Sequence, residues 1–202
     1  MTKIIFCVIV VLFSYLNIHS QNDAQFQIDA PSDWKKETIK FPLDFAPDII
    51  YQGFEELRFA PGMFNPKSDS YFSYTFFWWL KGKQNFTKES LEDNLEKYFK
   101  GLCKEVGNSR KLKIDLNKIN ARVMDYKQNG LQGKSFNNIY HAKIDMFDPF
   151  NKGEELLLNM EIAVLDNRDQ NKTIITFCAS PKSFEEPIWK QLREIRDSLQ
   201  IK

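Results

Sequence analysis

The segment from Tyr71 to Leu80, which reads YFSYTFFWWL, is the strongest strand signal in this chain of 202 residues. Aromatic and β-branched residues are enriched in strands, and eight of these ten residues are aromatic or Thr. Successive side chains of a strand point to opposite faces, so this segment presents apolar groups on both sides. Such a strand either lies inside a sheet that is covered on both faces, or turns one face towards a ligand.

Two amphipathic helices are predicted to pack on this sheet. Residues 88–101 follow Thr87, a favourable N-cap, and carry one apolar stripe at helical spacing with Leu95 at its middle. Residues 184–199 carry a second stripe, with Leu192 at its middle. We expect both leucines to be buried against the sheet.

Shorter alternating segments supply the other strands. The expected ranges are 34–41, 55–60, 110–119, 122–126, 135–145, 154–165 and 172–178, the last two forming a hairpin. Consecutive strands with short connections favour antiparallel pairing. We therefore predict an α+β fold with a single antiparallel sheet of about six or seven strands, formed by one domain over residues 34–202 after a loose lead-in at 21–33.

The first twenty residues have the layout of a secretory signal peptide. Lys3 is followed by the uncharged 13-residue segment Ile4–Leu16, which spans roughly 20 Å as a helix and is too short for a bilayer core. Ser20 supplies a small residue before Gln21, where we place the cleavage. The alternative is an N-terminal membrane anchor. No later segment approaches 18 apolar residues, so we predict a mature form that does not span a membrane and is periplasmic or extracellular.

The order of these elements resembles the PsbP/Mog1-like sandwich. The residues that carry the resemblance are the mid-chain helix 88–101, the meander that includes 154–178, and the closing helix 184–199. Gln21, directly after the predicted cut, also resembles the start of exported proteins of Bacteroidetes-type bacteria. The resemblance implies a fold and export, whereas a shared sandwich does not transfer an activity.

Charge and composition exclude several classes of function. The formal net charge of +1 gives no basic surface typical of nucleic-acid binding. After cleavage the chain holds one histidine, His141, and two cysteines, Cys103 and Cys178, without the spacing of a zinc site. No glycine-rich phosphate loop occurs, so we expect no metal and no cofactor. The two cysteines form a disulfide or stay as two buried thiols, and the sequence leaves both open.

The sequence places no set of residues with the spacing that a catalytic site requires. His141 and Asp145 share a face of the predicted strand, but they are about 13 Å apart at 3.3 Å per residue. Glu55 and Glu56 are adjacent and point to opposite faces, so they do not form the carboxylate pair of a glycosidase. We therefore name no catalytic residue.

The aromatic strand is the best candidate for a binding site. Tyr71, Phe77 and Trp79 share one face of it. The preceding segment supplies further residues that are placed to wall the same surface: Tyr51, Phe54, Arg58, Phe59 and Phe64. We predict that Trp79 lies exposed at this surface, whereas Trp78 belongs to the core; the alternative is that all these aromatic residues are core.

These observations favour an exported, soluble binding or accessory domain without catalytic activity. It would recognise a protein partner or an apolar, aromatic-stacking ligand through a sheet face or through the loops of residues 41–64. The alternatives are a small secreted hydrolase that uses His141 or a carboxylate pair, and an envelope lipid carrier with a Phe-rich cavity.

Overall fold

The computed structural model describes residues 26–126, 138–167 and 171–201. The predicted signal peptide, residues 1–20, lies outside the described residues, as do residues 21–25 of the predicted lead-in. The described chain divides into two units. The larger unit comprises residues 28–199, and in the smaller one β1 (Phe26–Gln27) pairs antiparallel with β9 (Gln200–Ile201).

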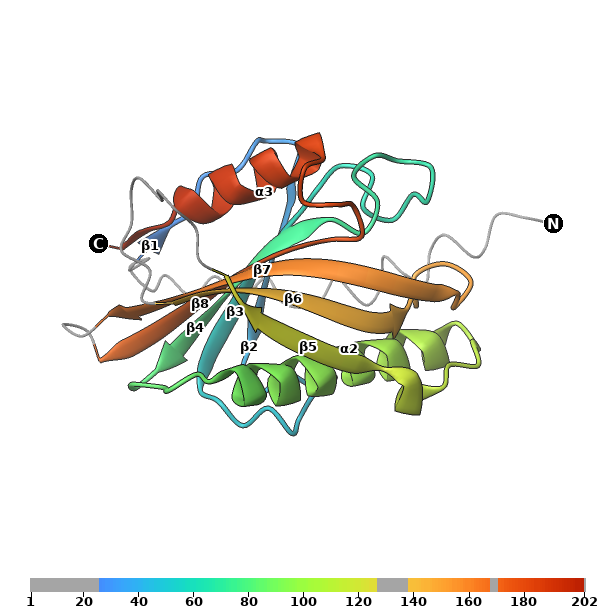
Figure 1. Cartoon of the computed structure of the whole chain (residues 1–202), viewed down its shortest axis with the longest axis horizontal. Coiled ribbons are helices and arrows are strands. Elements are labelled where there is room, and N and C mark those ends of the chain that lie inside the picture. Colours follow the sequence, from blue (N-terminus) through green and yellow to red (C-terminus); the bar gives the residue numbers. More distant parts are fainter. Residues whose placement is uncertain (1–25, 127–137, 168–170, 202) are drawn as a thin grey trace. The chain divides into compact units, whose positions relative to one another are not determined.

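Seven antiparallel strands form the sheet of the larger unit (Figure 1), which confirms the predicted α+β fold. Their spatial order is β2-β3-β4-β8-β7-β6-β5, so the aromatic strand lies inside the sheet and β2 and β5 are its edges. The strands are β2 (Lys35–Lys40), β3 (Gly53–Phe59), β4 (Tyr74–Lys81), β5 (Asn120–Asp125), β6 (Asn138–Phe147), β7 (Glu155–Asn167) and β8 (Lys172–Ser180). The predicted hairpin is β7 paired with β8.

The two helices cover opposite faces of this sheet (Figure 1). Helix α2 (Lys88–Ser109) packs on β5 and β6, and helix α3 (Pro187–Asp197) packs on β8 and β4. Leu95 and Leu192 are both fully buried, as predicted from their helical stripes. The β4 strand is apolar on both faces because each face has a helix to meet.

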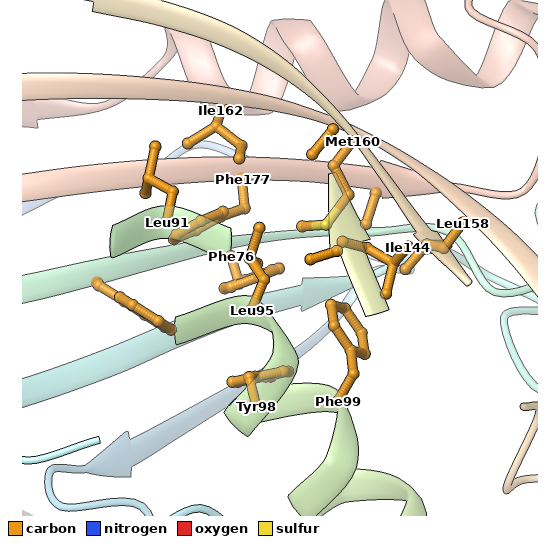
Figure 2. Close-up of a cluster of buried hydrophobic side chains, with 14 of the residues drawn as sticks. Phe76, Leu91, Leu95, Tyr98, Phe99, Ile144, Leu158, Met160, Ile162 and Phe177 are labelled. Atoms are coloured by element: carbon orange, nitrogen blue, oxygen red, sulfur yellow. The ribbon is translucent and has the colours of Figure 1, made fainter. Parts of the chain in front are cut away.

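The main core lies between the sheet and α2, as the close-up in Figure 2 shows. Phe76 of β4 stacks on Phe177 of β8, with ring centroids 4.3 Å apart, and on Tyr98 of α2 at 5.5 Å. Burying a large apolar side chain stabilises the folded state by about 1.5–3 kcal/mol. Many of the phenylalanines of the chain therefore pack in this core.

Both helices differ from their predicted bounds. Helix α2 continues to Ser109 instead of ending at residue 101. Gly101 lies inside the helix because the Phe45 carbonyl oxygen packs against it so closely that any side chain at this position would overlap that oxygen. Helix α3 begins at Pro187 rather than at residue 184. Proline has no N–H to leave unpaired in the first turn, and its fixed φ suits that position.

One expected strand is absent, and another begins later than predicted. Residues 110–119 form a connection that includes the 3-10 helix η1 (Leu116–Lys118), and Lys111 with φ of 60° breaks the extended backbone there. Tyr71 precedes β4 instead of lying in it. The backbone at Phe72 has φ of 49°, so the chain turns before the strand begins at Tyr74.

The two cysteines of the described chain are free and buried. Cys103 lies in α2 and donates to the carbonyl oxygen of Phe147, whereas Cys178 of β8 lies under α3 and donates to the carbonyl oxygen of Leu192. The sheet separates the two thiols, so of the two alternatives the structure shows buried thiols.

Candidate functional site

The five residues predicted to line a binding surface lie on two different faces of the sheet. Arg58 pairs with Thr75 across β3 and β4, and Phe77 and Trp79 share that face, which is the α3 side. Tyr51 and Tyr71 pack against the core on the α2 side. The structure therefore does not bring the five residues together into one site.

Trp79 and Phe77 are buried, so the expected exposure of Trp79 is wrong. Their exposed fractions are 5% and 1%. Trp79 stacks on Phe54 with ring centroids 6.1 Å apart, and the Lys172 Nζ lies 5.3 Å from its ring. The alternative, that these aromatic residues belong to the core, is correct for both Trp78 and Trp79.

Ser73 and Thr75 lie on the same face as Trp79, and this alternation of polar and aromatic residues in the sequence is typical of a surface that faces solvent. In the structure these hydroxyl groups are satisfied inside the protein. The Ser73 Oγ lies 2.8 Å from the Ser180 Oγ, and the Thr75 Oγ1 donates to the Leu192 carbonyl oxygen of α3 at 3.3 Å. Because these hydroxyl groups have hydrogen-bond partners, burying them costs little free energy. This part of the face can therefore be covered by α3 despite its polar residues.

Arg58 is held by its own strand and is not directed at a ligand. Its Nη1 donates to Glu56 at 2.9 Å and to the Leu57 carbonyl oxygen at 2.7 Å, and Glu56 also accepts from the hydroxyl of Thr38. Arg58 and Glu56 share one face of β3, and the ion pair between them fixes both side chains on the α3 side of that strand.

Tyr51 is part of the interior. Its ring packs on Phe41, Trp78 and Phe86, and its hydroxyl accepts a hydrogen bond from Asn94 of α2 at 3.1 Å. Burial raises its pKa, so the hydroxyl stays neutral. Tyr51 therefore positions α2 rather than a ligand.

Tyr71 belongs to an aromatic chain that leads to the surface. Its hydroxyl donates to Asp148, and its ring contacts Phe72. Phe72 contacts Phe150, and the Phe150 ring lies 5.1 Å from Phe64. Phe64 is 45% exposed, which is unusual for so large an apolar side chain held by rings on its inner side.

A pocket of about 270 Å³ lies directly beside Phe64. Its wall consists of the end of β3 and the turns that follow, together with Lys35 at the start of β2 and Asp33 in the turn before that strand. The lining residues are Asp33, Lys35, Phe59, Ala60, Pro61, Gly62, Met63, Phe64 and Asn65. Most of this surface is apolar or backbone, and Asp33 and Lys35 are exposed charges at its margin.

The turns that form this pocket are held by backbone hydrogen bonds. The amide of Met63 donates to Ala60, that of Asn65 to Gly62, and that of Phe72 to Met63 at 2.8 Å. Gly62 has φ of 82°, a conformation that other residues rarely adopt, so this turn requires glycine. The pocket is therefore built into the fold. Sequence reasoning named Phe59 and Phe64 as possible walls but missed Asp33 and Lys35.

A second cluster surrounds Glu161 of β7 on the α3 side of the sheet. Arg193 of α3 donates to both carboxylate oxygens, at 3.0 and 3.1 Å through its Nε, and Arg196 donates at 3.0 Å. Burial alone would raise the pKa of Glu161, but His141, Arg193 and Arg196 together lower it to about 2. The Glu161 carboxylate is thus ionised and fully engaged.

His141 lies beside this carboxylate between two aromatic rings. Its ring stacks on Tyr126 at 3.8 Å and on Phe184 at 4.2 Å, and its Nε2 is 3.6 Å from the nearer oxygen of Glu161. Cys178 of β8 pairs with Glu161 across the two strands, but burial raises the pKa of its thiol to about 12. We interpret the cluster as the anchor of α3 on the sheet.

The described residues offer little to hold a metal ion. Across residues 26–126, 138–167 and 171–201, no group of three or more His, Cys, Asp or Glu side chains has the arrangement of a metal site. None of the helices described is long and apolar enough to cross a membrane.

Comparison with known proteins adds no family to these observations. No protein-family model matches the chain, and no curated protein matches it. We take the pocket beside Phe64 as the candidate site, because it combines a preformed hollow with a large exposed aromatic side chain.

Proposed function

We propose that this protein is an exported binding domain that recognises a protein partner by receiving one of its apolar side chains in the pocket beside Phe64. The observation that carries the proposal is the combination of a preformed pocket and a large exposed aromatic side chain at its margin. Exposed aromatic residues next to a pocket are typical anchors of protein–protein interfaces.

The size of the pocket favours a protein side chain over a free ligand. Sites for drug-sized molecules and cofactors commonly enclose about 300–1,000 Å³, and this one measures about 270 Å³. A partner would bury the rest of its contact area on the ring surfaces of Phe64 and Phe150 and on the exposed parts of the turns. The same comparison disfavours a lipid carrier that would use this pocket.

Export is part of the proposal and rests on the N-terminal sequence. The charged Lys3, the uncharged segment Ile4–Leu16 and the small Ser20 support cleavage before Gln21. N-terminal sequencing of the secreted protein tests this: a chain that begins at or within a few residues of Gln21 is expected, whereas a membrane-bound chain that retains Ile4–Leu16 would contradict it.

A binding role is preferred over a hydrolase because of the groups around His141. Its neighbouring carboxylate, Glu161, is held by two arginines, and the Cys178 thiol is protonated and buried. Activation of a nucleophile requires a base within hydrogen-bond reach and a nucleophile that a substrate can approach. The Cys178 thiol is fully buried, so a substrate cannot approach it, and the Glu161 carboxylate is already engaged by the two arginines.

Site-directed photocrosslinking tests the proposed contact surface. A photoreactive amino acid is placed at Phe64, and, as the control, at Leu157, which is similarly exposed at 44% on β7. We expect crosslinks to one defined protein from position 64 only. Binding of that purified partner should then weaken at least tenfold in Phe64→Ala and stay unchanged in Leu157→Ala. Equal crosslinking from both positions would refute the proposal.

A further inference from the structure

Strand β2 leaves half of its backbone hydrogen-bonding groups unused by the described chain. The amide of Phe41 donates to the Gly53 carbonyl oxygen at 3.0 Å, which fixes which residues face β3. By the alternation of a strand, the N–H and C=O groups of Lys36, Thr38 and Lys40 point away from the sheet. Within residues 26–126, 138–167 and 171–201, nothing is hydrogen-bonded to these groups.

The opposite edge of the sheet is protected. The outward amide of Val123 in β5 donates to the Glu92 carboxylate of α2 at 2.7 Å, and that of Ala121 donates to Glu96 at 3.4 Å. Unprotected edges are templates for another strand, and proteins commonly cover them. This chain covers β5 with two carboxylates and has no such cover for β2 among its described residues.

The charges of β2 select what could pair with it. Its sequence is KKETIK, and the side chains of Lys35, Lys36 and Lys40 are exposed, whereas Glu37 is half-buried. Lysines on an edge discourage pairing with a second copy of the same strand, because like charges placed opposite each other are destabilising. The same lysines attract a strand that carries carboxylates.

The pocket beside Phe64 lies at one end of this edge. Lys35, the first residue of β2, pairs with Phe59 of β3, and both side chains line the pocket. A chain that ran along β2 would therefore pass the pocket margin at Asp33 and Lys35, and one of its side chains could enter it.

We infer that an extended acidic segment of the partner protein adds to β2 as an eighth strand and places one apolar side chain in the pocket. This inference rests on the proposed function and names the form of the partner. Lys36 and Lys40 lie on one face of β2, four residues apart. The segment should therefore carry two acidic residues four positions apart, followed or preceded within about three residues by an aromatic or large aliphatic one. Backbone hydrogen bonds supply affinity in such strand addition, and the pocket supplies specificity.

A displayed library of random twelve-residue peptides, selected on the purified protein, tests the inference. We expect peptides with the acidic spacing and the apolar residue described above. Their affinity should fall at least tenfold in Lys36→Pro, because proline removes only the outward N–H of an edge residue. Lys36→Ala is the matched control and should lose no more than about threefold.

A second measurement leaves the protein unchanged and so does not depend on the folding of Lys36→Pro. Every second amide of an added strand faces β2, and the amides between them face solvent. Two N-methylated peptides are therefore compared, one methylated at the first set of alternate amides and the other at the second set, and only one of the two sets removes hydrogen bonds to β2. We expect methylation of one set of amides to abolish binding and methylation of the other set to have little effect. The amide signals of Lys36, Thr38 and Lys40 should shift in NMR spectra on addition of the unmodified peptide.

The outcomes separate the inference from the proposed function. Peptides that need Phe64 but tolerate methylation of either set of amides and Lys36→Pro would overturn strand addition while leaving the pocket as a partner site. Failure to select any peptide that depends on Phe64 would overturn both. Self-association that Lys36→Pro abolishes would identify a second copy as the occupant and overturn the acidic partner.

Discussion

The indole Nε1 of Trp78 donates a hydrogen bond of 3.0 Å to the carboxyl group of Glu55, and both side chains are fully buried between the sheet and α2. Burial raises the pKa of Glu55 to about 8, although hydrogen bonds from Trp78 and Tyr98 act in the opposite direction. A carboxyl group in an aromatic interior avoids the desolvation of its charge by remaining protonated. Glu55 is therefore a neutral hydrogen-bonding group at pH 7.

This burial predicts that the free energy of unfolding decreases as the pH rises from about 4.5 to about 8. In this window the unfolded state releases the proton of Glu55 while the folded state retains it, so stability falls with rising pH. Glu55→Gln should remove this component and be more stable than the wild type above pH 8 by a few kcal/mol, at about 1.4 kcal/mol per pKa unit. Urea titrations at pH 4.5, 6 and 8.5 measure it, and a constant difference between the two proteins would contradict a protonated Glu55.

Glu161 predicts the opposite dependence on pH. Its pKa is lowered to about 2 in the folded state, so its contribution is complete above about 4.5 and is lost as the pH falls through 2. Glu161→Gln removes the carboxylate that pairs with Arg193 and with the buried Arg196, and it should cost about 3–5 kcal/mol at pH 7. This difference should shrink in denaturation experiments at pH 2–3.

Glu155→Gln is the matched control for Glu161→Gln. Glu155 lies on the same strand and forms an exposed ion pair with Lys118 at 3.2 Å. Exposed pairs contribute about 0–1 kcal/mol, so this substitution should change stability little at either pH. A similar loss in both variants would show that the network around Glu161 does not anchor α3.

Sequence patterns predicted those elements whose period is visible in a local window. The alternation of residues 154–165 identified β7, and the spacing of Leu95 and Leu192 identified the inner faces of both helices. The alternating residues 110–119 were misleading, because the conformation of Lys111 is set by the end of α2, where the amide of Leu112 donates to Gly107. A local pattern does not contain that constraint.

The candidate site was harder to predict because it depends on pairing between distant segments. Phe59 and Phe64 were named from the sequence, but Lys35 reaches them only through the register of β2 against β3. Trp79 was misplaced for a related reason. Thr75 has a polar side chain that indicates solvent locally, whereas in the structure it bonds to Leu192, 117 residues further along the chain.

The buried leucines of the two helices provide a direct test of the packing. Leu95→Ala and Leu192→Ala should each lower the free energy of unfolding by about 2–5 kcal/mol, because each leaves a cavity at a fully buried position. Leu157→Ala, on the exposed part of β7, should change it by less than about 1 kcal/mol. Thermal melts near the wild type for the two core variants would contradict the placement of the helices.

The carboxylate of Glu92 should protect the β5 edge, since it accepts a charge-assisted hydrogen bond from the Val123 amide. Glu92→Ala removes that bond and should cost about 1.5–3 kcal/mol. Hydrogen exchange of the Val123 amide should accelerate well beyond that of amides that face β6, and the freed edge should promote self-association at high concentration. Glu105→Ala, on the exposed side of the same helix, is the control and should leave both properties unchanged. Unaltered exchange at Val123 in Glu92→Ala would mean that α2 does not cap this edge, and the contrast between β5 and the open β2 strand would then no longer support strand addition at β2.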